Sequence, residues 1–349
     1  MIALCIHGFF FSMLGILNNG VGALKMLQVS SLWPFLYFFL FSSYNLSRLF
    51  RILEYSIVIS AVLIMLISVS LMLSAQFMDF SEYLALVDFL SFGSTIGTAD
   101  MISVFGYTIP GLMSVPFILG YLVFKYIENR RYRFGILFFA LVVFLSGRNA
   151  IYLVFFISPF FLFLISNKGF LLDFKRILSF YLLLGIVMLS VFVLLFNFYD
   201  LDLQSLLIDN FSDSNNLVRK KQADFLFSGF LDHPFFGVGL GVPHNQIIRN
   251  SISPWSYELS YHAMLYQTGL IGTIFYLLLI ILPILFQNVK FSNLFHHLEI
   301  ENRVAFSFGV LSLLVANYTN PYFYRFDAIW IIILIPFFLL NLKALRGKI

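Results

Sequence analysis

Long runs of apolar residues restrict the fold of this chain more than any other feature. A helix that spans a membrane needs about 20 mainly apolar residues. Hydrophobic residues make up 60% of the 349 residues and charged residues 11%, against about 25% charged in a soluble domain. This balance excludes a soluble globule and a disordered chain, and it predicts an all-α protein that crosses a bilayer many times. Runs at or near that length cover 2–19, 30–47, 52–77, 103–125, 134–166, 177–197, 259–287, 304–318 and 326–342.

Short basic clusters between these runs set the expected topology. Short cytoplasmic segments of membrane proteins are enriched in Lys and Arg. The predicted cytoplasmic clusters are Arg48 with Arg51, Lys125 with 130–133, Lys168 with 175–176, Lys290 with Arg303, and 343–348. Because basic residues are scattered in this way and the net charge is only +4, nucleic acid is not an expected partner.

The run 134–166 has basic residues on both flanks, so both of its ends are predicted to be cytoplasmic. As one straight helix it would be about 50 Å long, well beyond a hydrocarbon core of about 30 Å. We therefore expect a helical hairpin that turns at Ser146-Gly147-Arg148-Asn149. Its first arm is short, which predicts that Arg148 lies at membrane depth and faces a cavity.

Counting the hairpin as two helices gives about ten transmembrane helices in a single integral membrane domain over 1–349, with both termini cytoplasmic. The first run has no charged flank or small-residue cleavage site, so it is interpreted as a retained span. The predicted outward segments are 20–29, 78–102, 198–258 and 319–327.

Segment 198–258 is a long polar loop in an otherwise apolar chain, and long loops of this kind are usually functional. Leu217 to Leu231 is predicted to be a helix, which Pro234 ends. The Gly-Val-Gly-Leu-Gly stretch at 237–241 has no preceding strand, which argues against a nucleotide site. Close packing of its backbone against other helices is the favoured interpretation.

Three arginines are candidates for binding an anion on the outer side. Arg148 interrupts an apolar run, and a charge at bilayer depth is costly unless it has a function. Arg219 heads the predicted loop helix, and Arg249 precedes the next span. Arginine presents a rigid fork of donors that suits phosphate oxygens. A lipid diphosphate is the expected ligand, although a solvated basic face or a snorkelling side chain would also explain these residues.

His262, Glu258 and His244 are the candidate bases. Glu258 and His262 have the i, i+4 spacing of residues on one helix face, where a carboxylate can orient an imidazole. His244 follows the glycine stretch. Each histidine could equally be an interfacial residue with a local hydrogen bond. No metal and no other cofactor is expected, because no set of residues has ligand spacing on the outer face and Cys5 is the only cysteine.

Four motifs in this order resemble bacterial O-antigen polymerases (Wzy-type) of the O-antigen polymerase and ligase superfamily. The first is Ser-Gly-Arg-Asn at 146–149, and the second is an Arg-led helix that runs into Asp-His-Pro-Phe-Phe-Gly-Val-Gly-Leu-Gly, 219–241. The third is Arg249 ahead of Pro-Trp-Ser-Tyr-Glu-Leu-Ser-Tyr at 254–261. The fourth is Gln-Thr-Gly-Leu-Ile-Gly at 267–272. They cover about 146–272.

The resemblance implies a GT-C-like polytopic glycosyltransferase of the bacterial inner membrane that works without a metal. It would transfer a sugar chain from undecaprenyl diphosphate, with inversion, onto the next repeat unit at the periplasmic face. Segment 198–258 would be the periplasmic loop that carries part of the active site. Arg148, Arg219 and Arg249 match the arginines that hold the diphosphate. A chain-length regulator protein is a further partner that this function would have.

The resemblance leaves the base and the reaction open. In the ligases a His-Asn pair stands eleven residues before the helix glycine, whereas in this chain Glu258 occupies that position ahead of Gly269. This difference favours a polymerase over an O-antigen ligase. A polysaccharide lipid flippase is the main alternative of another class. Transporters usually spread charges over several spans, whereas this chain concentrates its intramembrane charge at Arg148.

Overall fold

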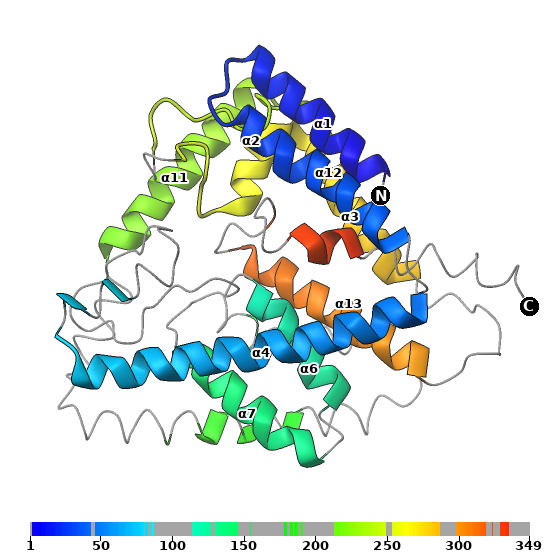
Figure 1. Cartoon of the computed structure of the whole chain (residues 1–349). Helices are drawn as coiled ribbons and strands as arrows, with labels where there is room; N and C mark the ends of the chain where they lie inside the picture. The colour runs from blue at the N-terminus through cyan, green and yellow to red at the C-terminus, as the bar shows by residue number, and fades with distance from the viewer. Residues whose placement is uncertain are drawn as a thin grey trace, which may run out of the picture. The chain divides into compact units, whose positions relative to one another are not determined.

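All the regular elements in the described part of the chain are helices (Figure 1). The computed structural model describes residues 2–42, 46–79, 81–82, 85–86, 114–126, 130–145, 154, 178–179, 182–183, 185–187, 190, 213–248, 253–286, 298–318, 323 and 329–334. The chain divides into two compact units. One comprises Met1–Ile52, Asp213–His296 and Asn317–Ile349, and the other Leu53–Ser212 and His297–Ala316.

Three of the described helical segments are long and apolar enough to cross a membrane: Ala23–Leu40, Arg51–Leu71 and Ser260–Ile284. Two shorter apolar helical stretches, Ile2–Leu17 and Ala305–Ala316, accompany them. The prediction of an all-α membrane protein is confirmed at this level. The number of about ten spans, the orientation of the termini and the hairpin over 134–166 stay predictions, because much of the chain that they concern lies outside the described residues.

The first unit begins with α1 (Ile2–Leu17), followed by a nearly continuous helical stretch made of α2 (Ala23–Leu27), a π-helical turn η1 (Gln28–Leu32) and α3 (Trp33–Ser42). Gly8 of α1 lies directly against the backbone of Ser30 in this stretch. The Ser31 hydroxyl joins the stretch to α1 by donating to the carbonyl of Cys5 at 3.0 Å. The Ser30 hydroxyl donates to the carbonyl of Met26 at 2.6 Å within the same stretch.

The span predicted over 30–47 begins earlier in the structure, because α2 starts at Ala23, and the outward placement of 20–29 stays a prediction. Asn19 takes the left-handed conformation (φ 55°), which asparagine tolerates better than most residues. The N–H of Gly20 then donates to the carbonyl of Gly15 at 2.8 Å. This tight reversal lets the next helix start at once, so Lys25 lies on α2 and Gln28 on the π-helical turn η1.

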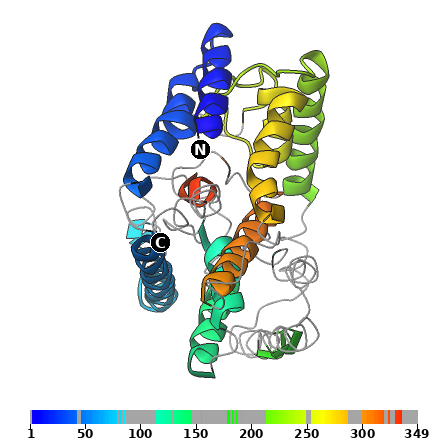
Figure 2. The same ribbon diagram turned by 90° about the vertical axis from the view of Figure 1, so that its right-hand side faces the viewer.

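The second unit contains α6 (Val115–Tyr126), α7 (Arg130–Leu145), α13 (Leu298–Ala316) and most of α4 (Leu46–Phe77). Helices α6 and α13 pack along each other (Figure 2). Gly120 makes this possible, because a side chain there would collide with the Ser312 hydroxyl. Glu54 of α4 and Lys125 of α6 form an ion pair at 2.5 Å.

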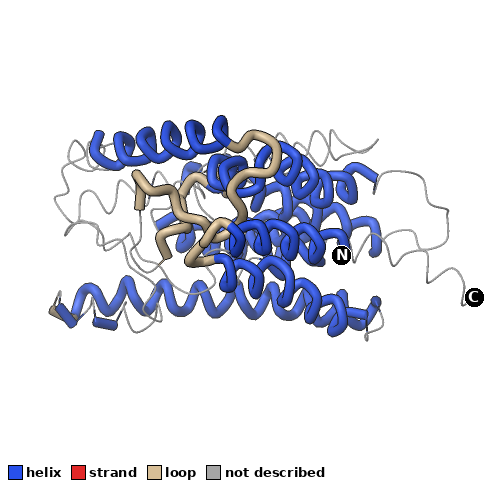
Figure 3. Tube along the Cα trace, turned by 90° about the horizontal axis from the view of Figure 1, so that it is seen from above, coloured by secondary structure: helices blue, strands red, loops and turns tan. Residues whose placement is uncertain are grey.

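The first unit also holds α11 (Asp213–Asp232) and α12 (Ser260–Phe286). Helix α11 confirms the helix predicted over Leu217 to Leu231. The described loop that follows it runs among the helices of this unit, as the tan tube in Figure 3 shows. That loop contains the glycine stretch at 237–241.

Gly269 interrupts α12, with φ 63° and ψ −173°. A continuous helix would pair the N–H groups of Leu270 and Ile271 with the carbonyls of Tyr266 and Gln267. Here these two N–H groups donate to the carbonyls of Pro234 and Phe235 at 2.8 and 3.1 Å. The two carbonyls accept instead from Val238 at 3.1 Å and Gly239 at 2.8 Å. The loop after α11 therefore satisfies all four backbone groups that the break in α12 exposes.

The glycines of this loop let its backbone come close enough to α12 to form these hydrogen bonds. Gly237, Gly239 and Gly241 all have positive φ, at 65°, 97° and 84°. A Cβ atom at Gly237 would collide with the backbone of α12, and one at Gly239 with the backbone of Gly15. The N–H of Leu240 donates to the carbonyl of Phe11 at 2.8 Å, which ties the loop to α1 as well. Close backbone packing, as the sequence indicated, is thus the role of this stretch.

Candidate functional site

Arg219 on α11 and Glu258 just before α12 form the central pair of the candidate site. The Nε atom of Arg219 donates to Oε2 of Glu258 at 3.1 Å. Both side chains are partly open to solvent, with exposed fractions of 33% and 27%. Among the described residues, the terminal nitrogens Nη1 and Nη2 of Arg219 make no hydrogen bond. Glu258 therefore orients the guanidinium group of Arg219. The Nη1 and Nη2 atoms of that group can still donate to a ligand.

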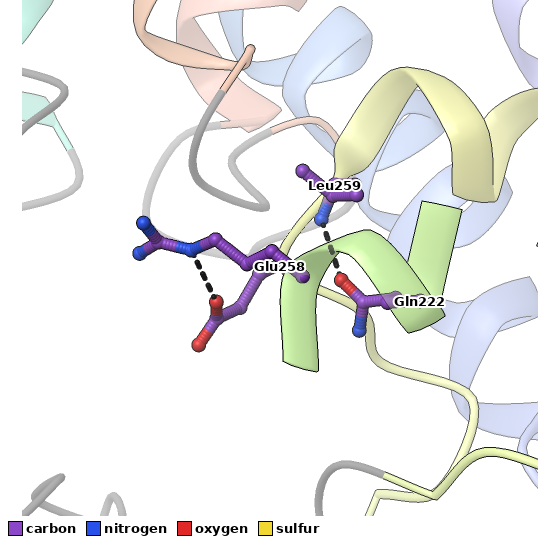
Figure 4. Close-up of polar contacts among 4 residues, drawn as sticks. Gln222, Glu258 and Leu259 are labelled. Atoms are coloured by element: carbon purple, nitrogen blue, oxygen red, sulfur yellow. Dashed lines mark hydrogen bonds and ion pairs between the residues drawn. The ribbon is translucent and has the colours of Figure 1, made fainter. Parts of the chain in front are cut away.

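Gln222 lies one turn after Arg219 on α11 and reaches the same segment. Its Oε1 accepts a hydrogen bond of 3.2 Å from the backbone N–H of Leu259 (Figure 4). The side chain is buried, and its Nε2 group has no hydrogen-bond partner among the residues that the structure describes. Two side chains of α11, at i and i+3, thus contact the consecutive residues Glu258 and Leu259.

The expectation that Glu258 and His262 share one helix face is wrong. Helix α12 begins at Ser260, so Glu258 lies in the bend before it. Its carboxylate pairs with Arg219, because a guanidinium is the stronger charge partner. His262 is half-buried within the first turn of α12. No ring or hydrogen-bond contact of its imidazole occurs among the described residues.

His244 lies between the rings of Phe225 and Tyr266, with centroids 5.7 and 5.4 Å away. Its Nδ1 accepts from the backbone N–H of Gln246 at 3.3 Å. A neutral imidazole that accepts at Nδ1 carries its hydrogen on Nε2, so that edge is a donor. Burial lowers the pKa of His244, and the carboxylate of Asp232 partly opposes this shift. The ring is therefore neutral at pH 7 but is not arranged to accept a proton at Nε2.

Tyr257 anchors the segment that carries Glu258. Its hydroxyl oxygen accepts from the backbone N–H of His244 at 2.5 Å. The ring is fully buried in a cluster with Leu226, Val238, Ala263 and Tyr266. Burial raises the pKa of Tyr257 above its ordinary value, so the phenol stays neutral. Apolar packing and one neutral hydrogen bond thus fix the chain at the backbone of His244 and one residue before Glu258.

Of the predicted site residues, the structure brings Arg219 and Glu258 together and places His244 and His262 in the same unit. Arg148 and Arg249 lie outside the described residues, as does the turn at 146–149. Gln222 was not predicted. Its i, i+3 spacing from Arg219 was the available signal, but its backbone partner Leu259 could not be read from the sequence.

Three described helices of membrane-spanning length indicate a helical membrane protein. The pair of Arg219 on α11 and Glu258 before α12 is its candidate anion site. A family model described as O-antigen ligase matches residues 134–277. The matched segment includes Arg219, Gln222, Glu258 and both histidines. This match confirms the likeness to the O-antigen polymerase and ligase superfamily. No curated protein and no solved structure gives a significant match.

Proposed function

We propose that this protein is an O-antigen or surface-polysaccharide polymerase of the bacterial inner membrane. It joins oligosaccharide repeat units carried on undecaprenyl diphosphate, by inverting glycosyl transfer at the periplasmic face. The observation that carries the proposal is the Arg219 guanidinium, which Glu258 orients at Nε while its Nη edge stays available. The family match over 134–277 supports the same class of chemistry.

The proposed reaction breaks the bond between the anomeric carbon and the diphosphate of the donor. The acceptor hydroxyl attacks that carbon, its proton passes to a base, and undecaprenyl diphosphate leaves with the bonding electrons. Negative charge grows on the diphosphate as the bond breaks. Fixed cationic donors stabilise such charge best in a site that is partly shielded from water. Arg219, with Arg148 and Arg249 as proposed partners, would supply these donors without a metal ion.

The geometry favours His262 as the base among the three candidates. The carboxylate of Glu258 already accepts a hydrogen bond from Arg219 at Oε2. His244 presents a donor at Nε2 while Gln246 occupies its Nδ1. His262 is half-buried near the start of α12 and carries neither constraint. Glu258 is then assigned to orienting Arg219, and His244 to holding the loop.

Single Ala variants at His262, Glu258 and His244 test this order. Each is assayed with purified lipid-linked repeat units at matched protein levels. We expect His262→Ala to reduce turnover by roughly 10²–10⁴, the usual contribution of a positioned base. Loss of turnover only in His244→Ala would assign the base to the loop histidine instead.

Ligation is the second candidate function, because the family model that matches is described as O-antigen ligase. The two reactions differ in the acceptor: another lipid-linked repeat unit for a polymerase, or a lipid A core oligosaccharide for a ligase. Supplying each acceptor separately distinguishes them. Product formation only on the lipid A core would replace the polymerase proposal with the ligase.

Arginine variants test the diphosphate role directly. Arg219→Lys keeps the charge but removes the planar donor fork, and Arg219→Ala removes both. Hydrogen bonds to charged groups contribute about 1.5–3 kcal/mol, so we expect Arg219→Ala to lower kcat/KM for the donor by roughly 10–100-fold. Lys221→Ala, an exposed basic residue of the same helix, is the control and should stay near wild type.

The same assay extends to the two other arginines. Arg148→Ala and Arg249→Ala should each lower turnover, with Arg249 in the supporting role. Unchanged polymer yield and length in both Arg148→Ala and Arg219→Ala would refute the proposed diphosphate site.

A further inference from the structure

We propose that Gln222 is a positioning residue that holds Glu258 against Arg219 and so fixes the direction of the Arg219 guanidinium. This inference rests on the proposed role of Arg219 in binding the diphosphate. Gln222 itself contacts neither the Nε of Arg219 nor the carboxylate of Glu258. It acts through the backbone of Leu259, the residue that follows Glu258.

The two bonds from α11 form a clamp on one short piece of chain. Arg219 and Gln222 are three residues apart, so they lie on the same face of the helix. The first binds the side chain of residue 258 at 3.1 Å, and the second binds the N–H of residue 259 at 3.2 Å. Figure 4 shows both bonds next to each other. Side chain and backbone of this piece are therefore held from the same helix.

Leu259 is the point where this segment becomes α12. Its carbonyl accepts the first bond of that helix, from Ala263 at 2.9 Å, whereas its N–H is one of the groups at a helix start that lack a partner inside the helix. Gln222 supplies that partner. The bend that contains Glu258 is thereby joined to the rigid start of α12.

The ion pair with Arg219 by itself contributes little to holding the Glu258 carboxylate in place. Both its members are partly exposed, and exposed ion pairs contribute little because water and salt screen them. The Gln222 side chain is only 1% exposed, so its hydrogen bond to the backbone is shielded. The buried bond is the better candidate for holding the carboxylate where the guanidinium meets it.

The unpaired Nε2 group of Gln222 argues for a role other than stability. A buried donor without a partner is unfavourable for folding, and an apolar side chain of similar size would avoid it. The Gln222 amide is thus unfavourable for packing, but its oxygen is well suited to accept a hydrogen bond from the N–H of Leu259. We therefore expect Gln222→Met to leave thermal stability near wild type, since it removes one hydrogen bond and one unpaired buried donor together.

The test measures turnover with lipid-linked repeat units, together with thermal unfolding, for Gln222→Met and the control Gln246→Met, whose side chain is exposed. We expect Gln222→Met to lower kcat/KM for the donor roughly threefold to tenfold, as for one lost hydrogen bond, while its unfolding temperature stays near that of the wild type. An unchanged kcat/KM in Gln222→Met, or an equal loss in Gln246→Met, would overturn the inference.

A double-mutant cycle separates positioning from a structural role. In the Glu258→Gln background, Gln222→Met should change turnover by less than about twofold, because the ion pair that it positions is already weakened. The same fold loss in both backgrounds would mean that Gln222 acts independently of Glu258, which contradicts the inference. If Arg219→Ala retains full turnover, the proposed role of Arg219 in binding the diphosphate fails. If Arg219→Ala is impaired and Gln222→Met is not, only the positioning role fails.

Discussion

The Arg219 guanidinium has two edges that can donate to a ligand, and Glu258 occupies only Nε. A carboxylate beside a ligand-binding arginine has two opposing effects. It lowers the net charge available to an anion, but it also fixes the plane in which the Nη donors lie. For a leaving group that gains charge during the reaction, a fixed donor geometry is the more useful property. On this account Glu258→Gln should weaken catalysis more than donor binding.

Comparing kcat and KM for Glu258→Gln checks this prediction. A lower kcat with KM within about threefold of wild type is expected, since the lost interaction belongs to the transition state. A higher KM with unchanged kcat would instead make Glu258 a determinant of ground-state binding.

His244 should make the loop after α11 sensitive to acid. Burial lowers the pKa of its imidazole, so the unfolded chain takes up the proton at a higher pH than the folded chain does. The stability that depends on neutral His244 is therefore complete above a pH of about 6.5 and is lost as the pH falls below that value. Hydrogen-exchange protection of 236–248 should decrease between pH 7.5 and 5.5, after correction for intrinsic rates. His244→Gln, which cannot titrate, should remove the pH dependence, and its persistence in this variant would refute the assignment.

At the scale of elements, the exchange of hydrogen bonds between α12 and the loop after α11 depends on glycine. Gly237 has φ 65°, and a Cβ there would lie 2.5–2.6 Å from backbone atoms of Tyr266, Gln267 and Gly269. The backbone conformation alone costs a non-glycine residue about 1–2 kcal/mol. We expect Gly237→Ala to lower the apparent unfolding temperature of the detergent-purified protein by several degrees. Gly135→Ala, where a Cβ meets nothing within 4 Å, should leave it unchanged or slightly raised, and equal losses in both would contradict this packing.

The sequence predicted these elements better than it predicted their contacts. The lengths of the apolar runs indicated α1, α4, α12 and α13. Within the polar segment 198–258, Pro234 and the glycines after it indicated where α11 ends and the chain turns. The early start of α2 was not predicted, because the apolar run that indicated this span begins at residue 30 and the reversal at Asn19 depends on one residue's conformation. The Arg219–Glu258 pair was missed because the spacing of Glu258 and His262 suggested a helix that in fact begins two residues later. Partners 39 residues apart in sequence are set by tertiary packing, which local patterns do not contain.

The proposed reaction at the periplasmic face requires that 198–258 lie outside the cytoplasmic membrane and that both termini lie inside. Reporter fusions at 215 should be active in the periplasm, whereas fusions at 129 and 349 should be active in the cytoplasm. Basic residues flank the latter positions, as the positive-inside rule demands. A cytoplasmic signal at 215 would place Arg219 and Glu258 on the side opposite to the proposed acceptor.

Reconstitution of the purified protein in liposomes with a single substrate, undecaprenyl-diphosphate-linked repeat units, tests the proposed polymerase reaction. Product length and released undecaprenyl diphosphate are measured together. We expect a ladder of polymers with one undecaprenyl diphosphate released per linkage, and a loss of both in Arg219→Ala. No polymer from the folded wild-type protein, or a ladder that Arg219→Ala leaves unchanged, would contradict the proposed reaction.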